Sequence, residues 1–159
     1  MNWPHIHLLL NHAPLFGAVF GTLLLALALW RRQELTHTAL FVLVFSGFAA
    51  IIVFLTGEPA ADALANAPEG LVDRHEDLAG VATILTGLAA AAALLALLVP
   101  PRFGALTRWM NGTVLALALG ASALLAWTAN LGGQINHPEV RRGAVTASPA
   151  HADEGVGQR

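Results

Sequence analysis

Four long apolar segments, separated by short polar connections, dominate the pattern of this sequence. A membrane-crossing helix needs about 20 mostly apolar residues, and four segments meet that need, at about residues 8–30, 38–56, 78–99 and 113–131. None of the four contains Lys, Arg, Asp or Glu. The pattern predicts an all-α protein, an integral membrane four-helix bundle with up-down topology.

Polar or helix-breaking residues follow each apolar segment. The second segment is expected to stop at Gly57-Glu58-Pro59 because proline cannot continue a helix. The first is expected to be a retained span and not a signal peptide, since its Arg31-Arg32 pair follows the apolar run. Residues 1–133 therefore form the predicted transmembrane domain. Residues 134–159 are polar and without periodicity, which predicts a disordered tail.

Composition supports a membrane location and excludes several functions. The chain is 56% hydrophobic and 11% charged, whereas soluble domains carry about 25% charged residues. It has no basic patch that could neutralise phosphates, so nucleic acid is not an expected partner. The absence of cysteine excludes disulfides, iron–sulfur clusters, thiolate nucleophiles and covalent c-type haem. The lipid bilayer is the first expected partner.

The distribution of charge predicts how the bundle is oriented. The first and third connections are basic, while the second is mainly acidic; the basic residues are Arg31, Arg32, Arg102 and Arg108. Basic connections stay in the cytoplasm. Both termini are therefore expected to be extracytoplasmic, in a multi-pass protein of the bacterial inner membrane.

Histidines gather near the outer ends of the predicted spans. Five of the seven lie there, at His5, His7, His12, His75 and His137. Histidine is the commonest metal ligand, and the stretch HIHLLLNHAP contains three. If the first helix begins near Pro4, His5 and His12 share a face. If it begins at Pro14 instead, Asn11 serves as its cap. In both cases His12 is the most deeply placed of the three.

The second connection supplies further candidate ligands. Glu58 closes the second span, while His75 and Glu76 lie on the first turns of a helix that continues into the third. These groups are expected to converge at the outer mouth of the bundle. We expect His12 and His75 to be the cofactor-binding pair. The wider set of candidate metal ligands is His5, His7, His12, Glu58, His75 and Glu76.

Three short motifs carry a resemblance to a known family. Asn11-His12-Ala13-Pro14, Gly57-Glu58-Pro59-Ala60 and Arg74-His75-Glu76 are similar to those of bacterial four-helix membrane proteins of the domain of unknown function 2231 type. The resemblance covers roughly residues 3–133 and implies the fold and topology, but no activity. The family has a proline directly after its first histidine, where this chain has Leu8. Its histidine after the fourth span lies farther along than His137, which leaves the role of His137 open.

Two functions fit these observations. The first is a membrane redox protein that binds b-type haem or a transition metal ion for electron transfer, which requires imidazoles from facing helices. The second is a non-catalytic accessory or scaffold subunit that binds no cofactor and docks respiratory or other membrane-complex subunits. A proton or ion pathway is disfavoured because no ionisable residue lies in the middle of the membrane, where such pathways are usually marked. Without a hydrolase nucleophile motif, the chain is not expected to be an enzyme on its own.

Overall fold

The computed structural model describes residues 3–62, 68–137, 139 and 141. Within these residues the chain is helical and has no strands. The main helices are α1 (Trp3–Leu10), α2 (His12–Trp30), α3 (Thr36–Ala61), α4 (Glu69–Leu98) and α5 (Gly104–Asn136). Short 3-10 turns, η1 (Gln33–Leu35) and η2 (Pro101–Phe103), lead into α3 and α5.

Four helical segments of the described chain are long and apolar enough to cross a membrane. They are Trp3–Trp30, Gln33–Ala61, Glu69–Leu98 and Gly104–Asn136, so α1 and α2 together make the first. In these segments, both the face toward the bundle interior and the face toward the outside are apolar. On α3, for example, Phe41, Phe45 and Phe48 follow one another on one face and are each more than 60% exposed. Helices that are apolar all round are typical of a membrane environment.

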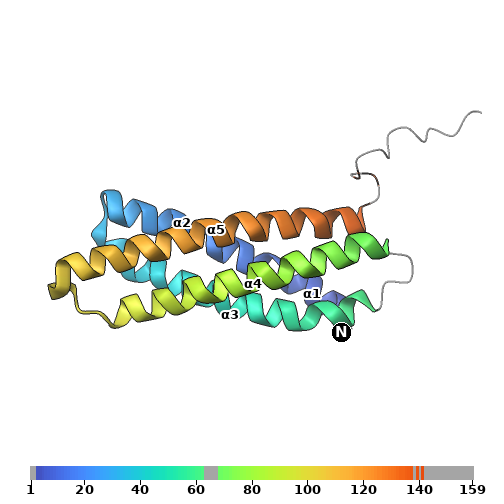
Figure 1. Ribbon diagram of the computed structural model, residues 1–159, viewed down its shortest axis with the longest axis horizontal. Coiled ribbons are helices and arrows are strands. Elements are labelled where there is room, and N and C mark those ends of the chain that lie inside the picture. The colour runs from blue at the N-terminus through green and yellow to red at the C-terminus, as the bar shows by residue number, and fades with distance from the viewer. Residues whose placement is uncertain (1–2, 63–67, 138, 140, 142–159) are drawn as a thin grey trace, which may run out of the picture.

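The helices pack as a closed bundle (Figure 1). Each long helix contacts the next along the chain, and α2 also contacts α5, while α1 lies mainly against α3. Successive helices run in opposite directions in Figure 1, so the start of α1, the end of α3, the start of α4 and the end of α5 meet at one end. We call this the histidine end. The other end carries Arg31 and Arg102, whose guanidinium groups lie over the rings of Trp30 and Phe103.

Small residues let the helices approach closely. Gly17 and Gly21 of α2 pack against α3: a Cβ at Gly17 would lie 3.0 Å from the Ser46 Cβ, and one at Gly21 would lie 2.7 Å from the Leu43 side chain. The buried core is correspondingly rich in alanine; its largest cluster comprises Leu25, Ala39, Leu40, Leu43, Ala93, Ala96, Val114 and Ala118. Close backbone approach of this kind is how helices associate in lipid.

A break at Asn11 divides the first span, which begins close to the predicted start at Pro4, while the second helix begins at His12 and not at Pro14. The chain is helical from Trp3, turns at Asn11 and continues from His12. Pro14 has no N–H to donate to the preceding turn, and its own carbonyl accepts a 2.7 Å hydrogen bond from Ser46 Oγ. Asn11 makes no side-chain capping bond.

Two expected helix ends differ in the structure. α3 does not stop at Gly57-Glu58-Pro59 but continues to Ala61, because Pro59 falls in its last turn, where Asp62 N still donates to Glu58 O at 3.1 Å. α5 continues to Asn136, past the expected end near residue 131. Residues 138, 140 and 142–159 of the expected tail lie outside the described residues.

Candidate histidine pair

His75 lies in the second turn of α4 and is half-buried against α5. Its Nδ1 is 3.0 Å from the backbone oxygen of Thr128. A carbonyl oxygen can only accept, so Nδ1 carries the hydrogen and Nε2 carries the lone pair. Gly132 makes room for this ring: a Cβ there would lie 3.1 Å from His75 Cε1.

His7 lies on α1 and is held by α3 in the same way. Its Nδ1 is 3.1 Å from Thr56 Oγ1. The Thr56 hydroxyl donates its one hydrogen to Val53 O at 2.9 Å, so it accepts from His7. Nδ1 of His7 therefore carries the hydrogen, and Nε2 again carries the lone pair. Gly57 leaves space beside this ring, because a Cβ there would lie 3.7 Å from His7 Cε1.

Both rings lie at the histidine end. His7 and His75 are within electrostatic range of each other although α1 and α4 are far apart in sequence. Both rings contact oxygen through Nδ1, and the backbone of Val53 also lies within hydrogen-bonding range of His7. The arrangement thus presents two half-buried imidazoles from different helices, each held through Nδ1.

The other predicted ligands are more exposed than these two histidines. His12 is exposed on α2, with its ring stacked on Phe16 at 6.1 Å between centroids. His5, Glu58 and Glu76 are exposed as well. Among the described residues, no group of three His, Asp or Glu side chains is placed to hold a metal ion.

Helix geometry explains why His7 faces inward and His12 does not. The two residues are five positions apart, which turns their side chains about 140° from each other around a continuous helix. The backbone at Asn11 stays in the right-handed helical region (φ −60°, ψ −22°), so the break does not undo this rotation. His7 is therefore half-buried against the bundle, and His12 is exposed.

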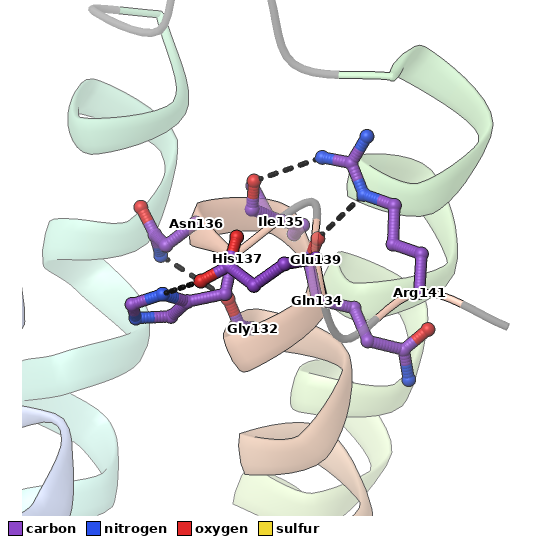
Figure 2. Close-up of polar contacts among 7 residues, drawn as sticks. All are labelled: Gly132, Gln134, Ile135, Asn136, His137, Glu139 and Arg141. Atoms are coloured by element: carbon purple, nitrogen blue, oxygen red, sulfur yellow. Dashed lines mark hydrogen bonds and ion pairs between the residues drawn. The ribbon is translucent and has the colours of Figure 1, made fainter. Parts of the chain in front are cut away.

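His137 belongs to a separate polar cluster at the end of α5 (Figure 2). Its Nδ1 donates to Glu139 Oε1 at 3.0 Å. The pKa of Glu139 lies below its ordinary value, because its own backbone N–H and then His137 hydrogen-bond to the carboxylate. Arg141 caps the helix by donating to the carbonyls of Gln134 and Ile135, at 2.8 and 3.1 Å. This cap accounts for the extension of α5 past the expected end.

The sequence did not single out the residues that hold the rings. Thr56 directly precedes the Gly57-Glu58 motif, but a threonine inside an apolar helix has no distinguishing pattern. Thr128 acts through its backbone, which no sequence signal reports. Gly132 lies beside the ring of His75, and no sequence signal reports that contact.

Comparison with known proteins identified no relative. No protein-family model, no curated protein and no solved structure matches this chain.

Proposed function

We propose that this protein is a multi-pass membrane protein that binds one transition-metal ion through His7 and His75. The observation that supports this best is that both rings are half-buried at the histidine end, held to oxygen through Nδ1 and within electrostatic range of each other. Metal-ligating histidines generally donate their other ring N–H to such an oxygen, which fixes the tautomer and the ring orientation.

The donor set indicates the class of metal. Imidazole suits zinc, copper, iron and nickel, and divalent copper binds most tightly of these to a given site. Two protein ligands leave positions for water or for a partner's side chain, as in sites that exchange ligands or electrons. A single ion needs only two converging nitrogens, whereas haem would also need a flat slot between α1 and α4. We therefore favour an ion over haem b.

The proposal assigns the ion an electron-transfer role at the membrane surface. His7 and His75 lie near the ends of their helices, at the histidine end of the bundle. An ion there would be within reach of respiratory or other membrane-complex subunits docked on the same end of the bundle. The proposal includes membership of the four-helix family of unknown function, on the basis of the three motifs that resemble it.

The experiment compares metal binding in three matched variants. The detergent-purified protein is stripped with a chelator and titrated with Cu(II) and Zn(II), and bound metal is counted by elemental analysis. We expect one ion per wild-type chain, and loss of that ion in His7→Ala and in His75→Ala. His12→Ala is the control and should bind as wild type does. Retention of the ion by His7→Ala, or its loss in His12→Ala, contradicts the proposed pair. A haem absorption band in protein isolated from its own membranes would show that the bound group is haem and not a single metal ion.

A cofactor-free accessory subunit is the second candidate, and one observation favours it. Among the described residues, no group of three His, Asp or Glu side chains is placed to hold a metal ion. This candidate is supported if wild-type protein from its native membrane holds no stoichiometric metal and co-purifies with a defined partner. His7→Ala should then weaken that partner's retention.

The proposal also places both termini outside the cytoplasm of a bacterial inner membrane. The arginine-rich connections lie at the end of the bundle opposite the histidine end, as the positive-inside rule requires of a cytoplasmic face. Single cysteines at the exposed positions Gln33 and Gly70 test this. An impermeant thiol reagent added to spheroplasts should label Gly70→Cys but not Gln33→Cys; the reverse pattern would invert the orientation.

A further inference from the structure

An open groove runs between α4 and α5 on the outside of the bundle, beside the histidine end. It is lined by Arg74, Asp77, Leu78, Val81, Trp127 and Leu131. The two charged residues lie on the turns of α4 nearest the histidine end. Leu78 and Val81 continue the same face farther into the apolar part of the helix. The groove is therefore polar at its mouth and apolar along its length.

The charged residues at the mouth are not engaged with the protein. Arg74 and Asp77 are both exposed, one helical turn apart. Neither makes an ion pair or a hydrogen bond within the described part of the chain. The groove thus offers one cationic and one anionic group side by side, each free to bind an external partner.

We propose that this groove binds a phospholipid whose headgroup carries both a phosphate and a primary ammonium, as phosphatidylethanolamine does. Arg74 would bind the phosphate bidentately, as guanidinium groups do, and Asp77 would accept from the ammonium. An acyl chain would lie against Leu78, Val81 and the 56% exposed ring of Trp127. Tryptophan is enriched at the membrane interface, where such a headgroup sits.

Charge complementarity favours this lipid over an anionic one. The first turns of α4 carry four acidic residues around the single Arg74, namely Glu69, Asp73, Glu76 and Asp77. A headgroup with only negative charge would bind Arg74 but be repelled by these carboxylates. A zwitterionic headgroup with a primary ammonium can pair its phosphate with Arg74 and its ammonium with the carboxylates. Phosphatidylcholine has the same charges, but its quaternary ammonium has no N–H to donate to Asp77.

A second groove between the same helices provides an internal contrast. It is lined by Ala92, Leu95, Trp109, Met110 and Thr113 and includes no charged side chain. An acyl chain can occupy it, but nothing in its lining distinguishes one headgroup from another. Headgroup selectivity should therefore arise at the first groove, where Arg74 and Asp77 line the mouth.

The test measures which lipid the intact protein retains. Protein in mild detergent is mixed with equal amounts of phosphatidylethanolamine, phosphatidylcholine and phosphatidylglycerol with identical acyl chains, and retained lipid is counted by native mass spectrometry. We expect phosphatidylethanolamine to be retained about threefold over each of the others, the scale of an exposed charge-assisted contact. Asp77→Asn should abolish the preference over phosphatidylcholine, and Arg74→Gln should reduce retention of all three lipids.

Controls separate the groove from general lipid binding. Arg108→Gln, an exposed arginine at the opposite end of the bundle, should leave both retention and preference unchanged. Circular dichroism checks that each variant keeps its helix content, and Arg74→Lys, which keeps the charge, should retain most binding. Equal or greater retention of phosphatidylglycerol, no retained lipid, or an unchanged preference in Asp77→Asn would overturn the proposal.

Discussion

The hydroxyl of Thr56 lies between the ring of His7 and the backbone of α3. It donates to Val53 O at 2.9 Å and accepts from His7 Nδ1 at 3.1 Å. Because the hydroxyl has only one hydrogen, these two bonds together fix which nitrogen of the ring is protonated. A residue on one helix thereby determines the tautomer of a ring on another.

Removing that hydroxyl should weaken metal binding without removing a ligand. Thr56→Val keeps the shape of the side chain but leaves His7 Nδ1 without its acceptor. We expect metal affinity to fall about 10- to 100-fold, the usual effect of losing an outer-shell partner. Thr56→Ser keeps the hydroxyl and should bind nearly as wild type. Affinities come from competition with a chelator of known strength, and equal affinity in Thr56→Val would show that the hydroxyl does not orient the ring.

Crowding the ring of His75 provides an independent test from α5. In Gly132→Ala the new methyl group would lie 3.1 Å from His75 Cε1, so the ring must shift. A shifted ring aims its Nε2 away from the site, and we expect metal affinity to fall roughly tenfold, the lower end of such effects. Gly133→Ala is the matched control, because a Cβ at Gly133 meets nothing within 4 Å. If metal affinity fell equally in the two variants, the effect would come from any added methyl group at this helix end and not from crowding of His75.

The sequence predicted the helices far better than the site, for a physical reason. Four uncharged apolar runs specify four helices by length alone. Which histidine faces the bundle depends on rotation around the helix, and the alternative starts at Pro4 and Pro14 left that rotation open. The structure keeps Asn11 helical, so His7 turns inward and His12 outward. Pro59 misled the prediction because a proline in the last turn removes one hydrogen bond without ending the helix.

Packing between α3 and α4 should be sensitive to one added methyl group. A Cβ at Gly47 would overlap the side chain of Ala90, and neither group can rotate out of the way. We expect Gly47→Ala to destabilise the protein by about 1–3 kcal/mol, seen as a lower midpoint of thermal unfolding in detergent. Gly87→Ala is the control: it meets nothing within 4 Å and improves helix propensity, so its midpoint should be unchanged or higher. A midpoint for Gly47→Ala at or above wild type would show that the helices are less closely packed there.

The His137–Glu139 contact at the end of α5 should depend on pH in one direction. The pKa of Glu139 is lowered by its own backbone N–H and then by His137. The contact is therefore fully formed above the ordinary carboxyl pKa of 4.5 and is lost as pH falls through the lowered value. His137→Ala should raise the pKa of Glu139 part of the way back, since the backbone bond remains. Carbon-13 NMR titration of the carboxyl group measures this, and an unchanged pKa in His137→Ala would exclude the contact.

The paired imidazoles are tested most directly by nitrogen-15 NMR of the histidine rings, recorded in detergent at neutral pH before and after addition of a diamagnetic zinc ion. Assignments come from the single His→Ala variants. Before zinc, His7 and His75 should both show a protonated Nδ1 and a lone pair on Nε2. Zinc should then shift the Nε2 resonances of these two rings together, saturating at one ion per chain, while His12 stays unchanged. Zinc shifts confined to His12 or to other histidines, or a protonated Nε2 on either His7 or His75, would contradict the account.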